Sequence, residues 1–132
     1  MIEPYKFVSL VRATLFRSIF GEHMTNKESP FACDMTAIAP EQRAGHITTI
    51  EKLFRSVKSC RELPDGYAFE LPNNSDILLT AAEFITNERL CCPFLGFAIE
   101  SEREGGPVWL RLSGRSGVKP FIMAEIGAHL NR

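Results

Sequence analysis

Apolar residues recur at the spacing of one helix face in three segments of the chain. These segments cover residues 40–57, 77–90 and 120–130. Pro40 and Pro120 suit the first turn of a helix, where a proline costs no hydrogen bond, and the polar run 73–76 offers several N-cap residues. We therefore expect three helices.

Between these segments the pattern changes to an alternation of apolar and polar residues, which is typical of half-buried strands. Two pairs of segments alternate in this way, 58–63 with 67–71 and 94–102 with 108–113. Asp65 and Gly66 separate the first pair, and a run ending in Gly105, Gly106 and Pro107 separates the second. Such residues favour tight turns, so each pair predicts a β-hairpin.

The predicted order of elements is helix, hairpin, helix, hairpin, helix. Hairpins make a sheet antiparallel, and three helices are enough to cover one of its faces. We therefore expect the α+β class, as a two-layer sandwich with a four-stranded antiparallel sheet and the helices on one face.

Trp109 falls on the outer side of this sheet if the alternation is followed strictly. When Leu110 and Leu112 point to the core, Trp109 and Arg111 point away from it. An exposed tryptophan on that face would mark a homodimer surface. The alternative is that Trp109 only lies over the neighbouring strands.

The start of the chain differs from the rest. Residues 1–30 are predicted to be an N-terminal extension and linker, with a short amphipathic helix in the apolar part, and residues 31–132 to be a single α+β domain. The polar stretch that opens at Met24 suits an alternative translation start. We therefore expect residues 1–23 to be dispensable for folding.

The charged residues limit which partners and which location we expect for the chain. Lys6, Arg12 and Arg17 interrupt every apolar run too early for a signal peptide or a membrane span, so we expect a cytoplasmic protein that does not insert in a membrane. The 132 residues include 15 basic and 16 acidic ones, a net charge of -1, which favours neither nucleic acid nor an anionic membrane as a partner.

The four cysteines are expected to be free thiols, because the cytosol keeps thiols reduced. No C-x-x-C spacing is present, which argues against a zinc finger, a zinc ribbon or a thioredoxin-like motif. The notable feature is instead an adjacent pair, Cys91 and Cys92, followed by Pro93, which ends the preceding helix.

Glu88 lies one turn before this pair, inside the apolar arc of its helix. A carboxylate on a core-facing side needs a partner. Arg89 points about 100° away around the helix, so the partner should come from another element. His46, on the apolar side of the first helix, is the candidate. The plainer interpretation is that Glu88 and His46 are a satisfied polar pair at the edge of the core.

A more specific interpretation joins these residues into one thiol-centred pocket. Its members are Cys33, His46, Glu88, Cys91 and Cys92. Thiolate, imidazole and carboxylate groups are ligands of zinc, and thiolates also suit softer ions. Because a helix C-terminus disfavours a thiolate, metal binding is favoured over nucleophilic catalysis, and no catalytic residue is assigned.

Several motifs together resemble a family of small uncharacterised bacterial proteins. They are Cys33-Asp34, Ala39 to Arg43 with His46, Leu63 to Tyr67, the E-R-x-C-C-P-F element Glu88 to Phe94, and Gly106 to Leu112. The resemblance implies that Cys33, His46, Glu88, Arg89, Cys91 and Cys92 belong to one pattern, and it implies no established activity. One departure is Ala39, where a capping serine would be usual.

We therefore expect a small ligand-binding or sensing domain that holds zinc or a softer metal ion through some of Cys33, His46, Glu88, Cys91 and Cys92, with Arg89 beside the ligand. One alternative is a thiol-dependent enzyme or redox protein that uses Cys91 or Cys92 as the reactive sulfur. The other is a non-catalytic interaction domain with structural cysteines.

Overall fold

A computed structural model of the chain describes residues 28–130 and has the predicted α+β class and element order. The helices are α2 (Pro40–Arg55), α3 (Ser75–Cys91) and α4 (Val118–Ile126), and the short 3-10 helices are η1 (Met35–Ala37) and η2 (Gly127–His129). The strands are β1 (Ser59–Leu63), β2 (Gly66–Leu71), β3 (Gly96–Ser101) and β4 (Val108–Ser113). The amphipathic helix expected before residue 28 lies outside the described residues.

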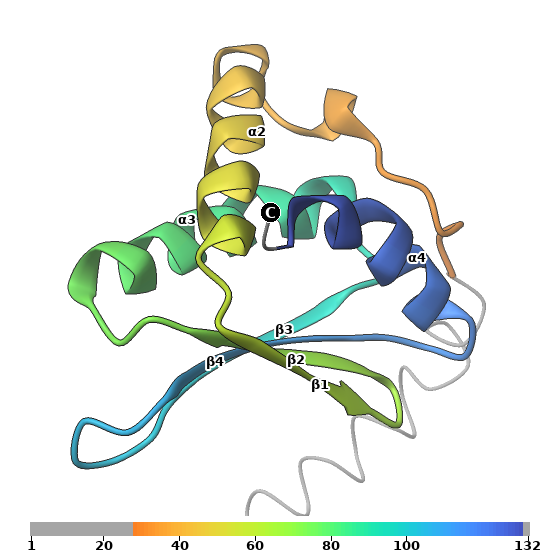
Figure 1. Ribbon diagram of the computed structural model, residues 1–132. Coiled ribbons are helices and arrows are strands. Elements are labelled where there is room, and N and C mark those ends of the chain that lie inside the picture. Colours follow the sequence, from red (N-terminus) through yellow and green to blue (C-terminus); the bar gives the residue numbers. More distant parts are fainter. Residues whose placement is uncertain (1–27, 131–132) are drawn as a thin grey trace, which may run out of the picture.

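The four strands form one antiparallel sheet in the order β1-β2-β4-β3. Each hairpin contributes two neighbouring strands, and β2 pairs with β4 at the centre. Figure 1 shows α2, α3 and α4 on the same side of this sheet, which makes the two-layer arrangement. The core lies between the layers and includes Phe54 of α2, Phe69 of β2 and Phe84 of α3, each almost fully buried.

The helix starts follow local chemistry. Asn74 caps α3, because its side-chain oxygen accepts a hydrogen bond of 2.8 Å from the main-chain N–H of Ile77. Helix α2 begins at Pro40 without a side-chain cap. Helix α4 begins at Val118 and not at Pro120 as expected, since a proline is tolerated anywhere in the first turn, where main-chain N–H groups have no helical partner.

The helix faces differ in part from the expected ones. The helical repeat of apolar residues predicts that Ile47 and Leu78 face the core, but they are 49% and 37% exposed. The same repeat puts Thr80 and Asn87 on the polar side of α3, and both are buried. The reason is that α3 contacts α2 as well as the sheet, so a wider arc of its surface is covered. The Thr80 hydroxyl is satisfied within its own helix.

Trp109 is buried, not exposed, so the expectation of an exposed tryptophan is wrong. The residue is 4% exposed, and the Arg61 guanidinium lies 4.2 Å from the centre of its ring. The indole N–H donates a hydrogen bond of 2.9 Å to Glu102. Arg61 of β1 and Glu102, which follows β3, thus supply a cation–π contact and a polar partner that cover the ring. A homodimer through this face stays a prediction without an exposed ring to support it.

Within residues 28–130, no helix is long and apolar enough to cross a membrane.

Candidate functional site

Glu88 lies in the last turn of α3 and is buried among the core residues. Its partner comes from α2, where Nε2 of the fully buried His46 lies 2.7 Å from Oε2 of Glu88. A carboxylate only accepts, so Nε2 carries the proton of this hydrogen bond. The other ring nitrogen, Nδ1, is buried without a hydrogen-bond partner among the described residues. The ring of Phe84 stacks on the imidazole at 6.0 Å.

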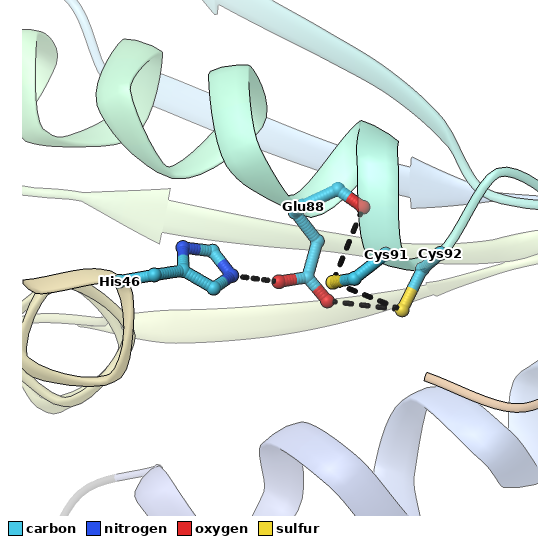
Figure 2. A network of polar contacts seen from close by, with 4 residues as sticks. All are labelled: His46, Glu88, Cys91 and Cys92. Carbon is cyan, nitrogen blue, oxygen red and sulfur yellow. Dashed lines mark hydrogen bonds and ion pairs between the residues drawn. The ribbon is translucent and has the colours of Figure 1, made fainter. Parts of the chain in front are cut away.

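Cys91 and Cys92 end the same helix, next to this pair (Figure 2). Their sulfur atoms lie 3.8 Å apart, well beyond a disulfide bond of about 2.0 Å, and both thiols are free. The Cys92 thiol is 3.2 Å from Oε1 of Glu88, so this carboxylate contacts a thiol on one oxygen and an imidazole on the other. When protonated, Cys91 donates to the main-chain oxygen of Glu88 at 3.6 Å.

The end of α3 explains how two adjacent side chains reach one place. Successive residues in a helix point about 100° apart. Cys92, which precedes Pro93, has left helical geometry with φ −127° and ψ 68°. Its main-chain N–H still donates to the Glu88 carbonyl at 2.8 Å. The chain is thus anchored to the last turn while the Cys92 side chain is free to turn toward the Cys91 sulfur.

Cys33 reaches the same place from the segment that precedes η1. The neighbouring Asp34 donates its main-chain N–H to the carbonyl of Cys91 at 2.9 Å, which joins this segment to the end of α3. Arg43 of α2 holds the segment from the other side, because its Nε donates to the carbonyl oxygens of Met35 and Ile38, both at 3.0 Å. Cys33 is therefore held by contacts to both helices.

The four potential ligand atoms of Cys33, Glu88, Cys91 and Cys92 lie within 4.8 Å of one another. We call these four residues the thiol cluster. Three of its members are buried, and Cys33 is exposed. His46 lies outside the cluster and contacts it through Glu88. Arg89, which was expected beside the ligand, is exposed and does not belong to the thiol cluster. The fourth cysteine, Cys60, is exposed in β1.

The pKa values of Cys33, Cys91 and Cys92 differ widely, because the thiols are buried to different extents and contact one another. A hydrogen bond from Cys92 lowers the pKa of Cys91 to about 6, and burial opposes this shift. The same hydrogen bond, together with burial, raises the pKa of Cys92 far above its ordinary value. Burial and the proximity of Cys91 raise the pKa of Cys33 to about 12. Near neutral pH the cluster therefore holds one thiolate, on Cys91.

Burial alone would lower the pKa of His46, but interactions with Cys91 and Glu88 outweigh it and raise the pKa to about 9. His46 is then a cation that faces a carboxylate and a thiolate. Sequence reasoning weighed only the unfavourable dipole at the helix C-terminus, so it missed the lowered pKa of Cys91. The missing information was the thiol–thiol hydrogen bond, which depends on the local path of the chain.

A pocket of about 300 Å³ opens beside the thiol cluster and includes Cys33 and Glu88 in its lining. Most of the remaining lining is apolar, with Met35, Ile47, Ile50, Phe84 and Ile126. Sequence analysis did not identify this pocket, because its walls come from η1, α2, α3 and α4.

No family model, curated protein or solved structure matches the chain. The functional inference therefore depends on the geometry of the site. Three sulfurs and one carboxylate converge at the edge of an apolar pocket, with a histidine that orients the carboxylate. Groups of this kind bind metal ions or react as thiols. The sulfur of Cys91 is fully buried, which favours a ligand that stays bound over repeated turnover of a substrate.

Proposed function

We propose that this domain binds a soft or borderline metal ion through Cys33, Glu88, Cys91 and Cys92, with zinc or a softer ion such as copper(I) as the ligand. The observation that carries the proposal is the convergence of their four ligand atoms to within 4.8 Å. Thiolates select zinc and softer ions, and one carboxylate completes a four-coordinate set.

The spacing of the sulfurs supports this proposal. In a tetrahedral site with zinc–sulfur bonds of about 2.3 Å, two thiolates lie about 3.8 Å apart. The sulfurs of Cys91 and Cys92 are 3.8 Å apart without an ion. The other separations in the thiol cluster reach at most 4.8 Å, so the site would contract by about 1 Å or less on binding.

His46 supports the same proposal from outside the cluster. Its contact to Oε2 of Glu88 leaves Oε1 directed at the Cys92 thiol, on the side where the ion would bind. Carboxylate ligands of metals are commonly oriented by such an outer hydrogen bond, and its loss typically weakens metal binding 10- to 100-fold. His46 is thus a positioning residue in this proposal and not a ligand.

The protonation states suit an ion that displaces protons. Cys91 supplies one thiolate at neutral pH, and Cys33 and Cys92 hold their protons until an ion binds. A bound cation drives the remaining thiols to ionise, so metal binding releases protons and strengthens as the pH rises. The buried His46 cation offsets part of the negative charge that the thiolates and Glu88 then carry.

The test is a titration of the reduced full-length protein with zinc, cadmium or copper(I), followed by thermal unfolding. An ion at 100 times its dissociation constant should stabilise the fold by about 2.7 kcal/mol, which raises the melting temperature by roughly 10 to 20 °C. Cys91→Ser should abolish most of this shift, because serine is a poor ligand for soft ions.

Cys60→Ser is the matched control, since Cys60 is a free thiol on β1 outside the thiol cluster. It should leave the metal-induced shift unchanged. An unchanged melting temperature of the wild-type protein with all three ions would refute the proposal. So would equal losses in the Cys60→Ser and Cys91→Ser variants.

A further inference from the structure

We infer that the thiol cluster binds a monosubstituted trivalent arsenical, in which a thiol-reactive arsenic atom carries one apolar organic group. The inference rests on the proposed function, because it uses the same thiols. Its additional observation is the apolar pocket of about 300 Å³ whose lining includes Cys33 and Glu88. A bare ion would use the cluster and leave this pocket without a role.

The pocket has the size and lining for a hydrocarbon group. A dry, apolar cavity of about 150 Å³ is enough to hold benzene, so this pocket has room for a phenyl group even though it is open on one side. Met35, Ile50, Phe84 and Ile126 would contact such a group. These four side chains offer no hydrogen bond to a polar ligand, and an apolar substituent needs none. Glu125 and His129 complete the lining, and both are at least partly exposed to solvent.

The number of thiols fits the valence of the arsenical. Trivalent arsenic with one organic group has two exchangeable positions, and Cys91 and Cys92 offer two sulfurs 3.8 Å apart. Each of the two arsenic–hydroxyl bonds of the hydrated arsenical is replaced by an arsenic–sulfur bond. Each hydroxyl group leaves as water with one proton, one from the Cys92 thiol and one from the His46 imidazolium, which holds the proton of Cys91. Arsenic stays trivalent, so no oxidant or reductant is needed.

The product adds no charge to a buried site. One thiolate and one thiol have become two neutral arsenic–sulfur bonds, His46 has given up one proton, and Nε2 of His46 still donates to Glu88, so the net charge is unchanged. Burying unpaired charge costs several kcal/mol, so a neutral adduct suits residues that are at most 8% exposed. The organic group takes the third position on arsenic and extends toward the pocket that Cys33 borders.

The contribution of Cys33 to binding should differ between two kinds of arsenical. Inorganic arsenite has three exchangeable positions and would engage Cys33, Cys91 and Cys92. A monosubstituted arsenical has only two and would leave Cys33 free. Cys33→Ser should therefore weaken arsenite at least tenfold and change the affinity for phenylarsine oxide less than threefold.

The experiment measures the binding of phenylarsine oxide, methylarsonous acid and arsenite to the full-length protein, with a phosphine as the reductant so that no other thiol competes. Burial of a phenyl in place of a methyl group should tighten binding roughly 10- to 100-fold. Ile47→Trp, at a half-exposed position in the pocket wall, should remove most of that advantage and leave arsenite binding unchanged. Leu79→Trp is the matched control on an exposed position of α3 outside the pocket lining.

Intact-mass spectrometry checks the stoichiometry, with one phenylarsenic group gained and two protons lost per chain. Equal affinities for the phenyl and methyl compounds would overturn the inference, as would equal effects of Ile47→Trp and Leu79→Trp. If cadmium binds and no arsenical does, the inference fails and the proposed function stands. If neither binds, the proposed function fails as well.

Discussion

Cys91 and His46 hold opposite charges in a place from which water is largely excluded. The pKa of Cys91 is lowered to about 6 and that of His46 is raised to about 9, so near neutral pH a proton has in effect moved from the thiol to the imidazole. In the unfolded chain, both the thiol and the imidazole are mostly neutral between about pH 6.5 and 8.5. Folding therefore transfers a proton within the protein and takes up none from solvent.

This transfer predicts how the stability of the metal-free protein depends on pH. The raised pKa of His46 gives stability that is present below about pH 6.5 and lost as the pH rises through about 9. The lowered pKa of Cys91 gives stability that is present above about pH 8.5 and lost as the pH falls through about 6. The two effects oppose each other, so the free energy of unfolding should be nearly constant between pH 7 and 8.

Single variants should reveal how each of the two groups makes the free energy of unfolding depend on pH. In Cys91→Ser, the strongest interaction that raises the pKa of His46 is lost and Glu88 is left to oppose the effect of burial, so stability should depend only weakly on pH between 7 and 8. In His46→Gln, the hydrogen bond from Cys92 still lowers the pKa of Cys91, so stability should rise over the same range. Neither slope can exceed about 1.4 kcal/mol per pH unit, the value for one proton. Urea unfolding at several pH values measures them, and equal slopes in the two variants would contradict the assignment.

At the scale of elements, the position of Cys33 depends on a contact between η1 and α2. Arg43 reaches two carbonyl oxygens, those of Met35 and Ile38, from a single Nε atom, and a second guanidinium nitrogen lies 3.4 Å from the carbonyl oxygen of Thr36. A planar guanidinium suits several acceptors at once, whereas a lysine ammonium is a flexible point charge. On the side of α2, the segment that carries Cys33 is therefore held by this one side chain.

We accordingly predict that Arg43→Lys weakens zinc or cadmium binding about tenfold, because the thiol of Cys33 is then less well placed. The melting temperature of the metal-free protein should change by only a few degrees, since the replaced contacts are at the surface of the core. Arg55→Lys is the control, at the exposed end of the same helix. Equal affinities in the two variants would show that Arg43 does not position the site.

The helices and strands could be predicted because apolar residues recur with the period of a helix or of a strand, and the structure follows these periods. Differences appear where a local hydrogen bond overrides the period. Strand β3 begins at Gly96 and not at Phe94, because the Leu95 N–H donates to the Cys92 carbonyl at 3.0 Å and keeps the chain in a turn. Trp109 follows the alternation correctly, but the long Arg61 side chain covers it, which periodicity does not describe.

The candidate site was predictable in part. Glu88 was conspicuous because a carboxylate within an apolar arc needs a partner, and the structure supplies His46. The approach of Cys33 was suggested only by the resemblance and by its residue type. Its place depends on the path of residues 28–38, which main-chain contacts and Arg43 determine. No periodic pattern encodes such a path.

At the scale of the whole molecule, aromatic contacts join the first described residues to the rest of the domain. Phe31 packs against Phe94 at 5.2 Å and Phe121 at 6.4 Å, and the Arg115 guanidinium lies 4.1 Å from its ring centre. Arg115 also donates to the carbonyl oxygen of Ser29. We therefore predict that the stable domain begins before Ser29, whereas the sequence pattern alone predicts a start at residue 31.

This boundary predicts different results for two shortened chains. A chain that begins at Met24 keeps these contacts, so it should melt within a few degrees of the full-length protein and bind zinc or cadmium with the same affinity. A chain that begins at Asp34 lacks Phe31 and Cys33, so it should lose roughly 2 to 4 kcal/mol of stability and most of the metal affinity. Calorimetry measures both quantities. Failure of the chain from Met24 to fold would show that residues 1–23 are needed.

If the thiol cluster binds the proposed ion, the hydrogen bond from Asp34 to the carbonyl of Cys91 should affect how long that ion stays bound. Cys33 is exposed and belongs to a short segment, whereas Cys91 and Cys92 belong to the core. The ion would then leave when the segment around Cys33 opens locally, without unfolding of the sheet or of α3. Its dissociation rate would follow the local opening free energy of this segment and depend little on the global stability of the domain.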